Sequence, residues 1–131
     1  MSAKSRGINA ERELIHAFWA TKEWTACRVA GSGSMKYPCP DIIALSSSRR
    51  LAVECKLCSG DNQYLTAEEI NDLRDYATRS GCEAWIAMRF SHEKWRFLRA
   101  DHLPTTEKMY VISRTTATEK GLLFEQITNP S

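Results

Sequence analysis

Two apolar segments, residues 40–45 and 51–56, carry the side chains in this chain of 131 residues that are best suited to chemistry. Asp41 lies at the head of the first segment, and the second contains Glu54 and Lys56 two positions apart. Because alternate residues of a strand share a face, Glu54 and Lys56 are expected to point the same way. A hairpin between the segments would bring Asp41 beside them. Each of these residues alone is more often a solvated charge on a strand face, but the combination is more specific.

A pair of carboxylates beside a lysine suits a divalent metal ion, because two neighbouring carboxylates raise each other's pKa unless a cation separates them. Mg²⁺ accepts one or two carboxylates and keeps several water ligands. It lowers the pKa of a bound water and stabilises charge on a phosphoryl oxygen, while a nearby lysine can orient the water or offset charge. The pattern therefore predicts a site for phosphodiester hydrolysis. On the opposite strand face, Val53, Cys55 and Leu57 are expected to enter an apolar layer.

The residues ahead of the hairpin predict a helix, a strand and a loop that lead into this site. An apolar stripe at helical spacing predicts an amphipathic helix over residues 7–20. Glu11 lies inside the stripe, where a carboxylate needs a partner, which is either an arginine or the metal site itself. Residues 24–30 alternate as a short strand. The glycine- and serine-rich residues 31–40 form a loop that fits a plain linker and a phosphate-binding segment equally well.

The residues after the hairpin predict a capped helix and further strands. Thr66 and Glu69 fit the N-cap and N3 positions of a capping box, and Gly81 fits the end of the helix. This helix connects one strand to the next, as in a βαβ unit. The other expected elements are strands at 84–89, 95–99 and 110–112, a loose polar segment at 113–120, and a short helix or edge strand at 122–127.

Length and composition favour one α/β domain, residues 1–131, with a central mixed sheet of about five strands flanked by helices. No apolar run reaches the length of a membrane span, and the N-terminal residues lack the apolar core of a signal peptide. Residues 1–60 carry nine Lys and Arg against five Asp and Glu, whereas the rest carry nine against eleven. The half that contains the predicted site is therefore the basic one, which weakly favours a phosphate-rich partner.

The five cysteines, without an export signal, indicate reduced thiols in the cytoplasm. Cys55 and Cys58 form a Cys-x-x-Cys pair, which offers a rival interpretation as a zinc or redox motif. A structural zinc site needs a second ligand pair at similar spacing, and a redox pair normally opens a helix. The other cysteines are scattered and Cys55 lies within a predicted strand, so buried or incidental thiols are the favoured interpretation.

Several motifs near the predicted site form a recognisable set. They are Gly7 to Arg12 with Glu11 between them, Arg28, Ser32-Gly33-Ser34, Pro40 to Ala44 with Asp41, and Glu54-Cys55-Lys56. This set resembles the archaeal Holliday junction resolvase, a member of the PD-(D/E)xK nuclease superfamily with a restriction-endonuclease-like core. The resemblance is close over the first 60 residues or so. Cys39 and Cys55 are its main departures from the usual pattern.

The resemblance implies a homodimer that cuts four-way DNA junctions with Mg²⁺, for which Mn²⁺ substitutes. The implied metal ligands are Glu11, Asp41, Glu54 and the backbone carbonyl of Cys55, and the implied catalytic residues also include Lys56, Arg28 and Ser32, with Ser34 as the alternative serine. The candidate DNA contacts are Lys4, Arg6, Arg12, Arg28, Ser32, Ser34 and Lys36. The candidate dimer contacts are Tyr64, Leu65, Leu73 and Tyr76. A sliding clamp is a further candidate partner, and no membrane partner is expected.

Three other functions stay open at this point. Another nuclease of the same superfamily would act on duplex or damaged DNA, as a restriction-like or repair enzyme. A DNA-binding module without catalysis would have no need of clustered acids such as Asp41 and Glu54. A thiol or zinc protein would contain stoichiometric zinc and lose its fold on chelation.

Overall fold

A computed structural model of the chain describes residues 2–29, 36–103 and 108–129. Ser32 and Ser34, two of the predicted site residues, lie outside the described residues. The elements in chain order are α1 (Ala3–Ala20), β1 (Trp24–Arg28), β2 (Ile42–Ser46), β3 (Arg50–Cys58), β4 (Asn62–Thr66), α2 (Ala67–Ser80), β5 (Glu83–Phe90), β6 (Arg96–Arg99), the 3₁₀ helix η2 (Ala100–His102), β7 (Met109–Ser113), α3 (Arg114–Lys120) and α4 (Phe124–Ile127).

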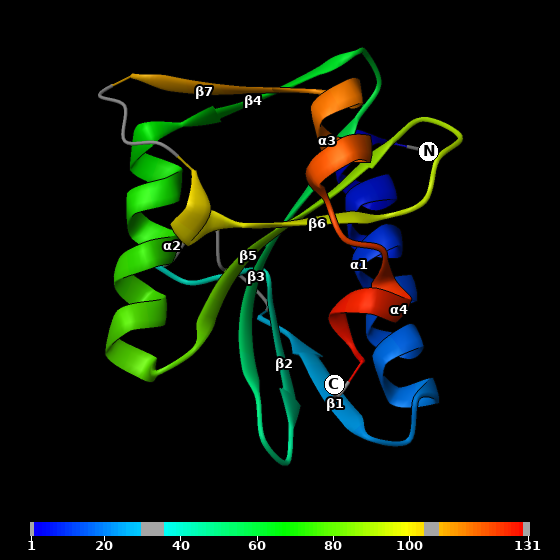
Figure 1. The fold of residues 1–131 in the computed structure, drawn as a ribbon, viewed down its shortest axis with the longest axis vertical. Helices are drawn as coiled ribbons and strands as arrows, with labels where there is room; N and C mark the ends of the chain where they lie inside the picture. Colours follow the sequence, from blue (N-terminus) through cyan, green and yellow to red (C-terminus); the bar gives the residue numbers. More distant parts are fainter. Residues whose placement is uncertain (1, 30–35, 104–107, 130–131) are drawn as a thin grey trace.

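A five-stranded mixed sheet lies at the centre of the fold, as the sequence predicted (Figure 1). Its strand order is β1-β2-β3-β5-β6, in which β3 and β5 are parallel and the other neighbours are antiparallel. The chain passes through α2 between the two parallel strands, so the predicted connection is present. β4 and β7 form a separate antiparallel pair, and β4 was not predicted.

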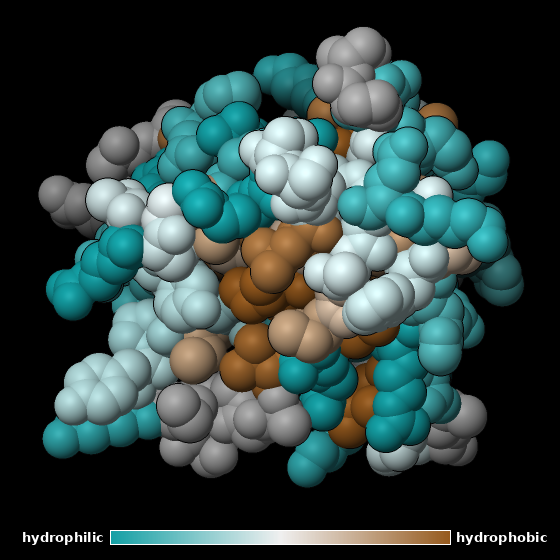
Figure 2. All heavy atoms as spheres, turned by 90° about the horizontal axis from the view of Figure 1, so that it is seen from below, coloured by the Kyte–Doolittle hydropathy of each residue, from teal (hydrophilic) through white to brown (hydrophobic). Residues whose placement is uncertain are grey.

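Apolar side chains fill both faces of the central sheet, with α2 over one face and α1 over the other (Figure 1). Alternate residues of β3 enter opposite cores, so that Ala52 packs on the α2 side and Val53 on the α1 side. Seen from below, hydrophobic side chains lie in the middle of the face and hydrophilic side chains surround them (Figure 2). Within the described part of the chain, no helix is both long and apolar enough to cross a membrane.

Side-chain caps set the ends of the two main helices. Ser2 accepts a hydrogen bond from the backbone N–H of Ser5, which allows α1 to begin earlier than the apolar stripe predicted. Thr66 caps α2 by accepting from the N–H of Glu69, as predicted. Gly81 ends α2 with a φ of 72°, a left-handed conformation that glycine adopts at little steric cost.

The structure corrects the sequence prediction at residues 113–120 and at Leu57. Residues 113–120, expected to be loose, form α3, because Ser113 caps the helix by accepting from the N–H of Thr116 and Ala117 packs into the core. Leu57, expected in an apolar layer, is 38% exposed. It lies near the end of β3, where it lines an open cavity.

Arg49 connects the β2–β3 hairpin to β5 and to α4 through hydrogen bonds. Its guanidinium donates to both carboxylate oxygens of Glu83, each at 2.9 Å, and to the carbonyl of Ile127 at 2.6 Å. It also lies 5.4 Å from the ring centre of Trp24. The hydrogen bonds from Arg49 hold the pKa of Glu83 below its usual value.

Replacing Arg49 with lysine is expected to lower the free energy of unfolding by about 2 kcal/mol, because an ammonium cannot reproduce the two parallel bonds to Glu83. Urea denaturation would measure this change. The neighbouring Arg50→Lys serves as control, since that guanidinium is exposed and reaches the Gly81 carbonyl at 3.3 Å. Equal losses in the two variants would contradict a special role for the paired bonds.

Candidate active site

Asp41 lies where β2 meets the edge of β3. Its backbone N–H donates to the carbonyl of Val53 at 3.0 Å, and its carbonyl accepts from Val29 at 2.9 Å. Its carboxylate accepts a hydrogen bond from the backbone N–H of Cys55 at 2.9 Å. In a strand, the N–H and C=O of one residue point to the same side. The Cys55 carbonyl therefore faces the edge of β3 at which the Asp41 carboxylate lies.

Glu54 is a largely buried carboxyl group next to this edge. Burial, followed by a hydrogen bond with Asp41 and repulsion from its charge, raises the pKa of Glu54 from 4.5 to about 9. The positive charge of Lys56 lowers that pKa in part. At neutral pH, Glu54 therefore holds a proton, because partial burial and the neighbouring charge of Asp41 both disfavour a second negative charge there.

Glu11 is the third acid of the predicted set, and it is paired with an arginine. The guanidinium of Arg28 donates to its carboxylate at 2.7 Å, and the Glu11 side chain is 15% exposed. Burial raises the pKa of Glu11, the bond from Arg28 opposes this rise, and the charge of Asp41 adds to it. Of the two partners that the sequence left open, the arginine is the one that Glu11 contacts, although Asp41 is near enough to influence it.

The donor atoms at this edge suit a hard divalent cation. The carboxylates of Asp41 and Glu54 and the carbonyl of Cys55 are all oxygen donors, which Mg²⁺ and similar ions prefer. A cation between the two carboxylates would take the place of the proton on Glu54. In the side-chain positions of the described residues, no group of three or more His, Cys, Asp or Glu is compact enough to hold a metal ion. The third acid, Glu11, is the one that Arg28 engages.

Lys56 lies on the same face of β3 as Glu54, because the residues before and after this pair, Ala52 and Cys58, both pack on the α2 side. Its Nζ lies 2.9 Å from a carboxylate oxygen of Glu69, in the first turn of α2. The sequence predicted Glu69 as a capping residue only. Its side chain instead forms an ion pair with Lys56. Lys56 and Glu69 belong to different elements, so the spacing of residues in the sequence does not reveal this contact.

Cys55 and Cys58 lie in the cores on opposite sides of the sheet, so they do not form a ligand pair. All five cysteines are free thiols. Burial raises the pKa of the Cys55 thiol well above its usual value, which leaves it protonated and unreactive. The structure therefore gives no support to a zinc or redox motif at these two positions.

The predicted DNA contacts lie on two sides of the site. Arg6, Glu11 and Lys56 line a cavity of about 600 Å³ on the α1 side, together with Arg89 and His92, which the sequence did not single out. Arg89 lies near the end of β5, and His92 lies in the turn between β5 and β6. Both are far along the chain from the motifs, so the fold is what brings them to this cavity.

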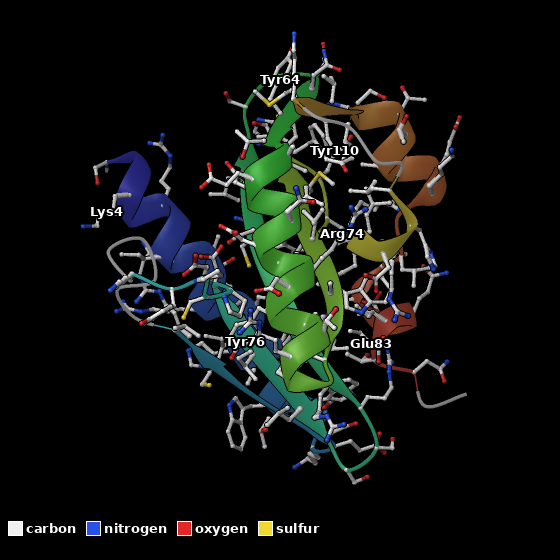
Figure 3. All side chains as sticks on the ribbon, turned by 90° about the vertical axis from the view of Figure 1, so that its left-hand side faces the viewer. Lys4, Tyr64, Arg74, Tyr76, Glu83 and Tyr110 are labelled. Carbon is white, nitrogen blue, oxygen red and sulfur yellow. The ribbon has the colours of Figure 1, made fainter. Side chains whose placement is uncertain are left out.

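Lys36 lines a second cavity, of about 740 Å³, which also contains Glu54 and Glu69. The two remaining candidates, Lys4 and Arg12, are exposed on α1. Lys4 points away from the body of the protein (Figure 3). Of these basic candidates, Lys36 is the one that shares a cavity with Glu54.

A mixed sheet with helices on both faces and an Asp, Glu and Lys set at one strand edge defines a nuclease of the restriction-endonuclease-like fold. The family described as archaeal Holliday junction resolvase (hjc) matches residues 2–130. The chain therefore belongs to the archaeal Holliday junction resolvase family.

Individual relatives agree with this family. The crossover junction endodeoxyribonuclease Hjc of Archaeoglobus fulgidus is 38% identical over 112 residues, which cover 86% of this chain and 82% of the relative. The enzyme of the same name from Sulfurisphaera tokodaii is 34% identical over 129 residues, with 96% and 88% covered. The solved structure of Archaeoglobus fulgidus Hjc, a Holliday junction resolvase, superposes with a TM-score of 0.84 at 33% identity, covering 94% of this chain and all of that one.

Proposed function

We propose that this protein is a structure-selective endonuclease that cuts four-way DNA junctions by metal-dependent phosphodiester hydrolysis, in recombination and repair. The observation that carries the proposal is the placement of Asp41, Glu54 and Lys56 at one strand edge. The Asp41 carboxylate accepts from the Cys55 N–H at 2.9 Å, and Glu54 and Lys56 share one face of β3. A divalent cation between these two acids would offset the repulsion between their charges. The similarity to crossover junction endodeoxyribonucleases supports a junction as the substrate.

The proposed metal is Mg²⁺, with Mn²⁺ as a substitute, because the donors are all oxygen atoms. Asp41, Glu54 and the Cys55 carbonyl would hold it, and Glu11 would be a further ligand if its ion pair with Arg28 opened. When bound, the ion lowers the pKa of a water molecule and stabilises negative charge on the phosphoryl group.

The other proposed roles belong to residues that contact the DNA. Lys56 offsets the charge that develops on the scissile phosphate, and Arg28 and Ser32 hold the scissile strand, with Ser34 as the alternative serine. Arg28 is suited to this role because releasing Glu11 frees its guanidinium for a phosphate. The proposed phosphate contacts away from the scissile bond are Lys4, Arg6, Arg12 and Lys36. Such contacts read the path of the backbone, which suits recognition of a branch by its shape.

A direct test compares a four-way junction with linear duplexes that have the same arm sequences. We expect paired, symmetrical nicks in the junction with Mg²⁺ or Mn²⁺, and no cutting with EDTA. Equal cutting of the duplexes would keep the metal site and change the substrate to ordinary or damaged duplex. Tight binding of the junction without cutting in any divalent metal would contradict the enzymatic proposal.

We propose a homodimer, because paired cuts in a nearly two-fold junction require two equivalent sites. Of the dimer contacts suggested by the sequence, Leu65 and Leu73 are buried in the protein's own core, whereas Tyr64 is 56% exposed. Tyr64 lies opposite Val111 on the outer face of the β4–β7 pair, at the top of the molecule in Figure 3. Val111 and Met109 are 57% and 45% exposed, so this face presents an apolar strip to a second copy.

Replacing Val111 with lysine is expected to convert the dimer to a monomer, since it places a charge in the apolar strip. Sedimentation velocity would measure the change. Leu45→Lys is the matched control, because Leu45 is 39% exposed on β2, in the other sheet. A Val111→Lys protein that stays dimeric would place the interface elsewhere, for example around Tyr76 on α2.

A further inference from the structure

Glu69 is the acid that Lys56 contacts directly, although it lies outside the predicted set of metal ligands. Its Oε2 atom is 2.9 Å from the Nζ of Lys56. That oxygen is buried, and within the described residues no hydrogen bond of good geometry reaches it. The two atoms are close, but their angles do not meet the criteria for a hydrogen bond. The contact is therefore an ion pair. Lys56 is therefore the cation that compensates a buried carboxylate oxygen.

The place of Glu69 in α2 fixes where its carboxylate can reach. Its backbone N–H donates to the side chain of Thr66 at 3.0 Å, so the first turn of the helix is locked by its cap. A negative charge in the first turn is also favoured by the helix dipole. Ala67 and Ile70, on either side in the same turn, are buried against the sheet. Glu69 therefore presents its charge from a rigid position.

Lys56 by itself has no such rigidity, because four methylene groups separate its ammonium from the backbone. It lies between Glu54 on its own strand and Glu69 on the helix above, and it influences the charge of Glu54. The ammonium is 2.9 Å from Glu69, and the Lys56 side chain is 27% exposed. Glu69, which is not one of the proposed metal ligands, can thus hold the ammonium in place.

We infer that Glu69 is a positioning residue for Lys56, holding its ammonium over the strand edge where the scissile phosphate is to bind. The inference rests on the proposed function, because it takes Lys56 as the group that meets the phosphate. The role belongs to Glu69 and not to Glu68, which is exposed in the same turn. Glu68 thus supplies a matched control in the same first turn of α2, with a similar contribution from the helix dipole.

The test measures single-turnover cleavage of a four-way junction by Glu69→Gln, Glu69→Asp and Glu68→Gln, each alone and with Lys56→Ala. Glu69→Gln is expected to slow cleavage about tenfold, at the low end of the effect of groups that orient active-site ligands. Glu69→Asp should recover part of the rate because it keeps the charge, and Glu68→Gln should match the unaltered protein. Combined with Lys56→Ala, Glu69→Gln should cause no further loss. Junction binding, measured with Ca²⁺, should be equal throughout.

A second readout uses metal-free protein and needs no cleavage. Relaxation of the Lys56 side chain, measured by NMR, should show greater mobility in Glu69→Gln than in Glu68→Gln. Equal rates and equal mobility in these two variants would overturn the inference, as would a Glu69→Gln loss of the same size with and without Lys56. A Lys56→Ala protein that cuts at the full rate would instead overturn the role of the lysine in the proposed function, and the inference with it.

Discussion

Asp41→Asn is expected to reduce junction cleavage at least about a thousandfold, because several kcal/mol of metal-dependent stabilisation of the transition state would be lost. The Asp41 carboxylate accepts a hydrogen bond from the Cys55 N–H, and it is close enough to Glu54 to raise the pKa of that group. Asp41→Asn keeps the size of the side chain but cannot carry the charge that a cation requires. Single-turnover cleavage in Mg²⁺, over a range of ion concentrations, would measure the loss.

Binding of the uncut junction separates a catalytic defect from a folding defect. It should stay close to that of the unaltered protein, because the proposed phosphate contacts come from other residues. Asp72→Asn is the matched control, since Asp72 is an exposed acid that lines the same cavity as Glu54. An Asp41→Asn protein that folds, binds and cuts normally would contradict the metal assignment. Loss of binding together with cleavage would instead assign Asp41 to DNA recognition.

The arrangement of the residues at the centre of the candidate site could be predicted because their geometry is local. Strand alternation alone placed Glu54 and Lys56 on one face, and a short hairpin brought Asp41 to them. The two ends of α2 could be predicted for the same reason, because Thr66 and Gly81 act through backbone groups a few residues away. In each case, the partner that gives the residue its role lies within one strand pair or one helical turn.

Other features depend on contacts that no local pattern specifies. Glu11 needed a partner, but the choice between Arg28 and the metal site depends on how α1 packs against β1. The ion pair between Lys56 and Glu69 joins a strand to a helix that returns across it. α3 looked polar because only one small side chain, Ala117, anchors it in the core. Sequence patterns thus identified the chemistry, whereas packing decided which neighbours tune it.

The metal-free protein should become less stable as the pH rises, because the folded state keeps a proton on Glu54 that the unfolded state has lost. The pKa of this group is about 9 in the folded protein and near 4.5 in an unfolded chain. Between these values, the folded state binds one more proton than the unfolded state, so stability falls with pH by about 1.4 kcal/mol per unit. The contribution is fully present below about pH 4.5 and is lost as the pH passes through about 9.

Glu54→Gln is therefore expected to remove this part of the pH dependence, because a neutral amide takes the place of the protonated acid. Thermal unfolding in EDTA at pH 6 to 9 should show the midpoint of the unaltered protein falling by about 4 °C per unit, and that of the variant staying nearly level. Mg²⁺ should reduce the fall in the unaltered protein, since the ion replaces the proton and binds more tightly at high pH. Glu68→Gln, which changes an exposed acid, should keep the full slope. If Glu54→Gln keeps the full slope as well, the proton does not reside on Glu54. The two acids would then have to bind the metal ion without releasing a proton from Glu54.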